Sequence, residues 1–276
     1  MVVAEPTGAA MRTRTQAWVG VVAALMAAGL ASPAGGTGGA AAVPGAAGGP
    51  TRVTGSATDR PAVIGRRVIG HSVRGRPLRA FHLGDPAASW TAVAIGAMHG
   101  DEQQTRLPLQ HLLRHRPVDG VDLWVLPVLN PDGYRRGSRK NAHGVDLNRN
   151  FPVRWKDLDG DYESGPRPAS EPETRATLRF LRRVDPDRMI SLHQPLFNVD
   201  AKSSKRPLFS RRVARAMRIP IGNVDCGGVC HGTMTQWFNK RLHGASITVE
   251  LSADPGRRYL SSIGPDGLLR AIGGRR

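Results

Sequence analysis

The sequence predicts a single α/β domain with a mixed, mostly parallel central sheet and helices on both faces of the sheet. Three features of the chain support this prediction. Short apolar runs without polar alternation, such as TAVAIGAM at 91–98, are typical of strands that are buried on both faces. Segments with helical spacing lie between these runs, and this alternation indicates a parallel sheet. A hairpin pattern at 63–84 begins the domain.

The expected elements follow one another along the chain. The hairpin turns near Arg74-Gly75, and further strands are expected at 91–98, 121–130, 188–192 and 245–251. Helices are expected at 102–115, 171–184, 208–217, 233–242 and 267–272. The first of these helices carries its leucines on one side, as an amphipathic helix does. The segment from 130 to about 168 is rich in Gly, Asn and Arg and shows no periodicity, and loops of that length are commonly functional.

The first sixty residues differ in composition from the rest of the chain. A basic region precedes the apolar run 17–30, which is short for a membrane span, and Ser32-Pro33-Ala34 offers small residues for cleavage. An N-terminal membrane anchor and initiation at Met11 are the alternatives. We expect a secreted or cell-envelope protein with no stable membrane span in its mature form. The expected segments are a signal peptide at 1–34, a flexible Gly/Ala/Pro-rich linker at 35–60 and the folded domain at 61–276.

The charge of the chain is strongly positive. The formal net charge is +17 and the pI is about 11.4. The arginines are scattered rather than interleaved with aromatic residues, which make up only 5% of the chain, and this pattern argues against a nucleic-acid-binding protein. The charge favours electrostatic association with an anionic cell wall or membrane surface.

Two cysteines stand close together in DCGGVC. In an exported protein, Cys226 and Cys230 are most simply explained as a local disulfide across a Gly-Gly turn. Two unpaired thiols are the alternative.

Polar residues gather where the predicted strands end. His99, Asn130, His193 and Glu250 each lie at or near a strand end, and ligand sites of such sheets form beyond the carboxyl ends of the strands. His99 and Glu102 are three residues apart, so both can turn toward one metal ion. A polar turn leading into a helix explains this pair equally well when it is taken alone. The convergence of the four strand ends favours the metal site.

Five motifs in the same order carry a resemblance to a known family. They are HGDE at 99–102, NPDG at 130–133, GVDLNRNFP at 144–152, SLH at 191–193 and TVEL at 248–251. This series resembles the zinc metallocarboxypeptidases, the family of carboxypeptidase A, and its small bacterial members such as the murein peptide amidases in particular. GVDLNRNFP is the most specific of the five. The resemblance covers essentially the whole segment 61–276 and implies a zinc carboxypeptidase-like catalytic domain.

The resemblance implies the roles of individual residues. His99, Glu102 and His193 match the family's ligands of one Zn²⁺ ion, and Glu250 matches its general base. A carboxylate inside the apolar strand at 245–251 is costly to bury without such a purpose. The matches in the long loop are Arg139 for the stabilisation of the oxyanion, Asn148 and Arg149 for the substrate's terminal carboxylate, and Asp146 for the orientation of a ligand histidine. Arg135 and Arg136 lie close enough to compete for the role of Arg139.

The sequence also departs from the family's pattern. The digestive members place a tyrosine on a mobile loop about twenty residues before the base, and 223–239 contains no tyrosine. His231, Thr233 or Trp237 are the candidates to line that side of the site, and Thr235 is a candidate for the floor of the specificity pocket. The segment 35–60 is too short for the inhibitory prodomain of the digestive enzymes.

These observations favour an exported zinc-dependent hydrolase of an amide bond next to a free carboxylate. The expected substrate is a peptide, by preference a cell-wall muropeptide with a bond such as γ-glutamyl–diaminopimelate. A general metallocarboxypeptidase acting on ordinary peptides and an N-acyl amino acid deacylase are the enzymatic alternatives. A catalytically inactive binding protein would have lost a ligand or the base, and His99, Glu102, His193 and Glu250 are all present.

Overall fold

The structure is a computed structural model that describes residues 60–114, 116–201, 204–224 and 226–276. The expected signal peptide at 1–34 lies outside the described residues, as does the expected linker at 35–60 up to residue 59. The described residues all lie within one compact unit of the chain. Among them, no helix is both long enough and apolar enough to cross a membrane.

One eight-stranded sheet runs through the described part of the chain, in the order β1-β2-β4-β3-β5-β8-β6-β7. The four strands β4, β3, β5 and β8 are parallel to their neighbours within this group, whereas β1–β2, β2–β4 and β8–β6 are antiparallel pairs. The strands are β1 (Gly65–His71), β2 (Pro77–Gly84), β3 (Thr91–Ile95), β4 (Asp122–Leu126), β5 (Arg188–His193), β6 (Leu196–Asp200), β7 (Ile221–Gly222) and β8 (Ala245–Ser252). The mixed, mostly parallel sheet that the sequence predicts is confirmed.

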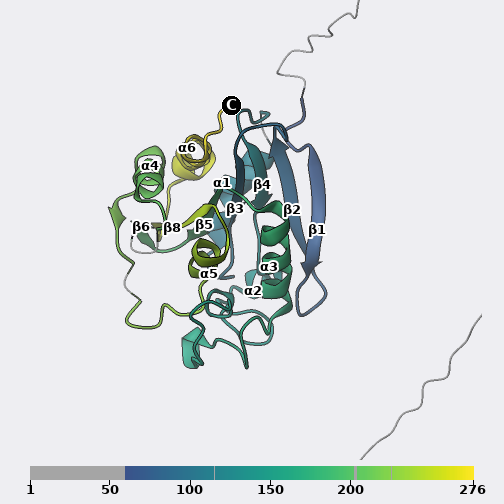
Figure 1. Cartoon of the computed structure of the whole chain (residues 1–276), viewed down its shortest axis with the longest axis vertical. Coiled ribbons are helices and arrows are strands. Elements are labelled where there is room, and N and C mark those ends of the chain that lie inside the picture. The colour runs from purple at the N-terminus through teal and green to yellow at the C-terminus, as the bar shows by residue number, and fades with distance from the viewer. Residues whose placement is uncertain (1–59, 115, 202–203, 225) are drawn as a thin grey trace, which may run out of the picture. The chain divides into compact units, whose positions relative to one another are not determined.

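Helices cover both faces of this sheet (Figure 1). The helices α1, α4 and α6 pack into one apolar cluster, and α3 and α5 pack into a second cluster on the opposite face. The α-helices are α1 (Arg106–Arg114), α2 (Pro131–Arg136), α3 (Pro172–Val184), α4 (Pro207–Met217), α5 (Met234–Arg241) and α6 (Gly264–Ile272). Short 3₁₀ turns lie at Gln103–Thr105, Leu147–Arg149 and Gly160–Tyr162, and a π-helical turn at Tyr259–Ile263 precedes α6.

The central strands divide their side chains between these two clusters. In β3, Ala92 and Ala94 belong to the first cluster, while Val93 and Ile95 belong to the second. Successive residues of a strand point to opposite faces, so a strand buried on both faces needs apolar residues at every position. This requirement explains the continuous apolar runs from which the sheet was predicted.

The structure contains elements that the sequence analysis did not anticipate. The segment from 130 onward was expected to be a loop, but NPDG at 130–133 begins α2, with Asn130 Oδ1 accepting a hydrogen bond from the Gly133 amide at 2.8 Å. Pro131 at the first helical position suits a helix start as well as it suits a turn, and Gly137 ends α2 in the left-handed region with φ +60°. The strand β6 and the edge strand β7, which lie at one side of the sheet, were also not predicted.

Candidate metal centre

Parallel packing brings three buried polar side chains to the carboxyl ends of β3 and β5. His99 and Glu102 lie on the loop that follows β3, and His193 is the last residue of β5, the strand beside β3. The backbone of this loop continues to pair beyond the strand, since the Leu129 amide donates to the Gly96 carbonyl and the Asn130 amide to the Ala97 carbonyl. The loop that carries the two ligands is therefore fixed to its neighbour.

The donor atoms of the three side chains converge on one point. One donor atom from each of His99, Glu102 and His193 lies within 4.8 Å of the other two, and this is the one such group of His, Cys, Asp or Glu among the described residues. The distance is 2.7 Å from His99 Nδ1 to Glu102 Oε1 and 3.0 Å from His193 Nδ1 to Glu102 Oε2. The two Nδ1 atoms are 3.3 Å apart. All three residues are buried.

This arrangement fits a zinc ion. Glu102 Oε2 is buried and makes no hydrogen bond in spite of its 3.0 Å distance from His193 Nδ1. A buried carboxylate oxygen without a hydrogen bond is costly unless a cation lies against it. Two imidazoles and one carboxylate are a ligand set of catalytic zinc sites, which keep the remaining position for water or substrate.

The opposite nitrogen of each histidine is held by a neighbour. His99 Nε2 lies 3.0 Å from Asp146 Oδ1, and His193 Nε2 lies 3.0 Å from the Ser191 hydroxyl. These contacts leave Nδ1 of both rings directed at the shared point, and such partners orient ligand histidines and set their tautomer. Asp146 thus contacts one of the two candidate ligand histidines, and its role in orienting that ring stays a prediction. Ser191 was not expected, although its place two residues before His193 on one strand puts both side chains on the same face.

The charges of the three ligands are coupled. Burial opposes charge on His99, yet the carboxylates of Glu102 and Asp146 raise the pKa of His99 to about 9. Burial also opposes charge on Glu102, but the imidazoles of His99 and His193 lower the pKa of Glu102 to about 2. Glu102 is therefore anionic at neutral pH. Zinc binds the neutral imidazole, so the metal competes with the proton that His99 otherwise holds.

Glu250 lies beside this centre. In the parallel pair of β5 and β8 it is the register partner of His193, so the sheet itself places it at the same edge. It is buried, and its Oε2 atom makes no hydrogen bond. Burial raises the pKa of Glu250, the imidazole of His193 opposes this rise, and the charge of Glu102 adds to it. A carboxylate whose proton affinity is raised is suited to accept a proton near neutral pH.

Arg139 lies against both Asp146 and the metal ligands. Its Nε and Nη2 atoms donate to Asp146 Oδ2 at 3.0 and 2.8 Å, and its Nη1 atom lies 3.2 Å from His99 Nδ1. Arg136 instead donates to the Asn141 carbonyl at 2.6 Å, and Arg135 is exposed. Of the three arginines, Arg139 is thus the one at the centre. Asp146 also accepts from the Asn148 amide at 2.8 Å, which begins the turn Leu147–Arg149.

The turn that carries Asn148 and Arg149 is hydrogen-bonded to the start of α5. Asn148 Oδ1 accepts from the Met234 amide at 3.0 Å, and the Arg149 guanidinium donates to the Asn148 carbonyl at 2.9 Å. Gly232 has φ +61°, and a Cβ atom there would lie 2.2 Å from the Arg149 carbonyl oxygen. Arg149 is buried and its Nε atom has no hydrogen bond, while burial lowers the pKa of Arg149.

Tyr162 is a residue at this site that the sequence analysis missed. Its ring lies 5.4 Å from the Arg139 guanidinium carbon and 5.0 Å from that of Arg149. The aromatic side chain next to the two arginines therefore comes from the turn Gly160–Tyr162 and not from the segment 223–239. Its presence in a long polar loop that also contains GVDLNRNFP is the signal that could have pointed to it.

The candidates from 223–239 lie in other places. Trp237 is fully buried in the second apolar cluster, so the expectation that it lines the site is wrong. Thr233 caps α5 by accepting from the Gln236 amide at 3.2 Å, and the Thr235 hydroxyl lies 2.9 Å from that of Thr248.

The structure pairs Cys226 with Cys230 in a disulfide. Both cysteines and His231 line a cavity of about 670 Å³.

Comparisons with known proteins agree with this geometry. The family model "Zinc carboxypeptidase" matches residues 54–195. Murein peptide amidase A of Escherichia coli (strain K12) is 33% identical over 219 residues, which cover 72% of this chain and 88% of that protein. Carboxypeptidase D of Mus musculus is 31% identical over 164 residues, which cover 42% of this chain and 11% of that protein.

Comparisons with solved structures show the same fold. The murein-tripeptide amidase of Escherichia coli O157 superposes with a TM-score of 0.62 at 29% identity, over 72% of this chain and 90% of that one. The carboxypeptidase A of Helicoverpa armigera superposes with a TM-score of 0.61 at 19% identity, over 76% of this chain and 64% of that one, and this likeness concerns the fold alone. With its His–Glu–His site intact, the chain is a member of the zinc carboxypeptidase family.

Proposed function

We propose that the protein is an exported amidase that hydrolyses an amide bond next to a free carboxylate in cell-wall peptides. The bond that we favour is of the γ-glutamyl–diaminopimelate type. The observation that carries the proposal is the likeness to murein peptide amidase A, which extends over most of both chains, together with the arginine-lined loop beside the metal centre.

We assign Glu250 the role of general base. When zinc is bound by His99, Glu102 and His193, it supplies Lewis-acid polarisation and lowers the pKa of water to about 7. Glu250 takes the proton of the attacking water on its carboxylate and then gives it to the departing amine. Its position beside His193 in the sheet and the burial that raises its pKa support this role.

The two arginines have separate tasks in the proposal. Arg149, with Asn148, binds the free carboxylate next to the cleaved bond, because a guanidinium offers two parallel hydrogen bonds to such a group. Arg139 stabilises the negative charge that develops on the carbonyl oxygen, and its contact with His99 beside the metal centre supports this role. Asp146 and Tyr162 hold these arginines in place.

The location is part of the proposal as well. The apolar run at 17–30 and the small residues at 32–34 support export, and the net charge of +17 supports an electrostatic association with an anionic cell envelope.

A substrate panel tests the proposal. The purified protein is assayed on a γ-D-glutamyl-diaminopimelate peptide, on the same peptide with its terminal carboxylate amidated, and on ordinary peptides with free C-termini. We expect chelator-sensitive hydrolysis of the first and loss of hydrolysis on amidation. Turnover of the amidated peptide would remove the role of Arg149 and favour a deacylase.

The second candidate is a metallocarboxypeptidase that acts on ordinary peptides, which the similarity to carboxypeptidase D favours. It predicts that the ordinary peptides are cleaved at least as fast as the muropeptide. Zinc binding without turnover of any member of the panel would instead indicate an inactive binding protein.

A further inference from the structure

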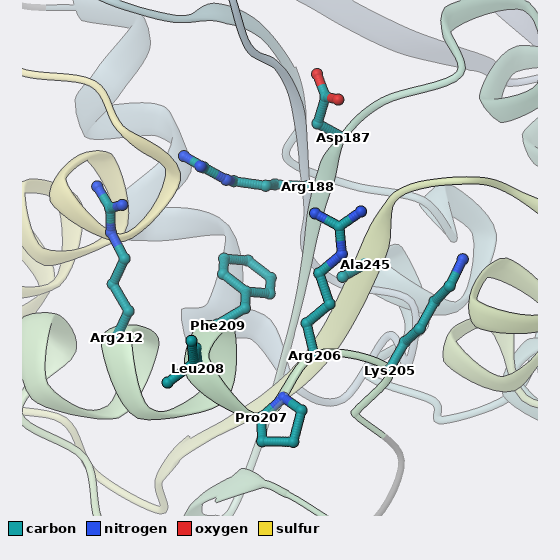
Figure 2. A pocket seen from close by; sticks show the side chains of 9 residues that line it. All are labelled: Asp187, Arg188, Lys205, Arg206, Pro207, Leu208, Phe209, Arg212 and Ala245. Carbon is teal, nitrogen blue, oxygen red and sulfur yellow. The ribbon is translucent and has the colours of Figure 1, made fainter.

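A second candidate ligand site lies at the opposite end of β5 from the metal centre. A cavity of about 490 Å³ opens between the first residues of β5 and β8 and the first turn of α4 (Figure 2). Its size falls within the range of ordinary ligand sites, which measure roughly 300–1,000 Å³. Arg188 begins β5 and His193 ends it, and a strand of that length spans about 16 Å. The cavity is therefore separate from the catalytic centre.

The cavity carries a marked excess of positive charge. Four basic side chains line it, and Asp187 is the one carboxylate among the described residues that do so. Asp187 is already engaged, because it accepts from the Thr91 amide at 2.9 Å and lies 3.1 Å from His243 Nε2. The four basic residues are Arg188, Lys205, Arg206 and Arg212.

Three of these cations are held in place by neutral partners. Arg188 donates to the Ile272 carbonyl at 2.7 Å, and Arg212 donates to the Arg270 carbonyl at 3.1 and 2.8 Å. Lys205 donates to two carbonyls beyond the end of α5 at 2.8 and 2.9 Å. Carbonyl oxygens fix these side chains without neutralising them, and Asp187 is the one carboxylate in the described lining to offset the four positive charges, so the site is preorganised for an anion.

The charges also repel one another. Burial lowers the pKa of Arg188, the nearby charges of Arg212 and Arg206 lower it further, and the carboxylate of Asp187 opposes them in part. The structure gives the Arg206 side chain no hydrogen bond or ion pair with any described residue. An anion between these groups would remove the repulsion and give Arg206 a partner.

The remaining wall of the cavity is apolar. Figure 2 shows Leu208 and Phe209 between Arg212 on one side and Arg206 on the other. Leu208 is 77% exposed, more than any other large apolar side chain in the described residues. A small inorganic anion would not use this surface. A ligand with an anionic head and an aliphatic chain would use both parts of the cavity.

We propose that this cavity binds an anionic membrane lipid, with the phosphate head group among Arg188, Arg206 and Arg212 and the first methylene groups along Leu208 and Phe209. Basic residues and an exposed aliphatic side chain are the features by which proteins bind to anionic membrane surfaces without spanning them. Because β5 separates the cavity from His193, a protein bound in this way keeps its metal centre away from the lipid.

Soluble short-chain lipids test this proposal directly. The full chain is titrated by calorimetry with short-chain phosphatidylglycerol, short-chain phosphatidylcholine and inorganic phosphate. We expect phosphatidylglycerol to bind at least about tenfold more tightly than either of the others, because only this ligand has both a net charge and an aliphatic part. Inorganic phosphate that binds as tightly as phosphatidylglycerol would overturn the assignment to a lipid. Equal binding of the two lipids, or no binding of either, would also overturn it.

Three variants place the binding in the cavity. Arg206→Glu reverses one charge, and we expect the Kd for phosphatidylglycerol to rise by about tenfold or more. Leu208→Ser should raise the Kd for the lipid and leave that for phosphate unchanged. Arg66→Glu is the matched control, since Arg66 is an exposed residue of the edge strand β1 with the same charge. Equal effects of Arg206→Glu and Arg66→Glu would show that the net charge alone attracts the lipid. All three variants should keep the hydrolytic activity, and a loss of activity in Arg206→Glu would contradict the separation of the two sites.

Discussion

Both candidate histidine ligands of the metal centre contact a neighbour that is not itself a ligand. Asp146 is fully buried and contacts both His99 and Arg139, so one carboxylate orients a ligand and the arginine beside it. Burial opposes charge on Asp146, but the charges of His99 and Arg139 lower its pKa well below the usual range. It is therefore anionic over the whole range in which the enzyme can work.

Replacing this carboxylate by an amide should weaken the centre. We predict that Asp146→Asn lowers the affinity for zinc by about 10- to 100-fold, because His99 loses the charged partner that fixes its ring. Competition with a zinc chelator measures the change. Asp101→Asn is the control, since Asp101 is exposed and adjacent to Glu102, and its zinc affinity should stay within about twofold of the wild type. Equal losses in the two variants would show that Asp146 has no special role.

Tyr162 should matter through its ring and not through its hydroxyl group. Two guanidinium groups lie against this ring, and an exposed contact of that kind contributes about 0.5–1 kcal/mol. We predict that Tyr162→Ala raises the KM for substrates with a free carboxylate by about five- to tenfold, whereas Tyr162→Phe changes it less than about twofold. Steady-state kinetics of both variants measure these changes in KM. A strong defect in Tyr162→Phe would indicate instead that the hydroxyl group takes part in catalysis.

At the scale of elements, the site depends on the close approach of two segments. Gly232 lies against the backbone of Arg149 and holds the left-handed conformation, while the Phe151 amide donates to the Gly232 carbonyl at 2.8 Å. This contact joins the loop that we propose binds the substrate to the start of α5.

A methyl group at Gly232 should therefore damage both stability and substrate binding. We predict that Gly232→Ala lowers the free energy of unfolding by more than the roughly 1–2 kcal/mol expected from its positive φ alone, and that it raises the KM. Gly144→Ala is the matched control, because Gly144 has φ +82° and no atom within 4 Å of its added Cβ. Denaturant unfolding and kinetics of the two variants test the prediction, and an unchanged KM in Gly232→Ala would contradict it.

The sequence was sufficient to predict the elements that the two apolar clusters bury. The continuous apolar runs predict the central strands, and the expected helices at 171–184 and 208–217 correspond closely to α3 and α4. The strands β6 and β7 escaped prediction because both are only partly buried and carry no continuous apolar pattern. The start of α2 escaped because Asn-Pro-Asp-Gly suits a turn and a capped helix equally well.

The candidate site was also predictable only in part. The metal ligands and Glu250 stand at strand ends within recognisable motifs, so their positions follow from the topology of the sheet. Ser191 and Tyr162 could not be identified in the same way. Their contacts with His193 and the arginines depend on side-chain orientation and on the path of a loop without periodicity, which no local pattern specifies.

At the scale of the whole molecule, we expect a bound metal to contribute to stability as well as to catalysis. The three ligands come from β5 and from the loop after β3, so a bound ion joins segments that are 94 residues apart in the sequence. Anything that binds only the folded state stabilises it according to its concentration relative to its Kd.

Removing the metal should lower the melting temperature. At a free zinc concentration about 100 times the Kd, the stabilisation is about 2.7 kcal/mol, which for a domain of this size corresponds to about 5–10 °C in Tm. Thermal melts with a chelator and after addition of zinc measure the shift. His193→Ala should melt at the same temperature in both conditions, and a chelator-independent Tm in the wild type would show that the ion does not hold these segments together.

The most direct test of the catalytic account compares zinc content and turnover in the wild type and in Glu250→Gln. Metal analysis should find about one zinc per chain in both proteins, because Glu250 is not one of the three ligands. Turnover of the γ-D-glutamyl-diaminopimelate peptide should fall by about 10²–10⁴-fold in the variant, the usual contribution of a general base. A Glu250→Gln protein that binds zinc and retains wild-type turnover would contradict the account.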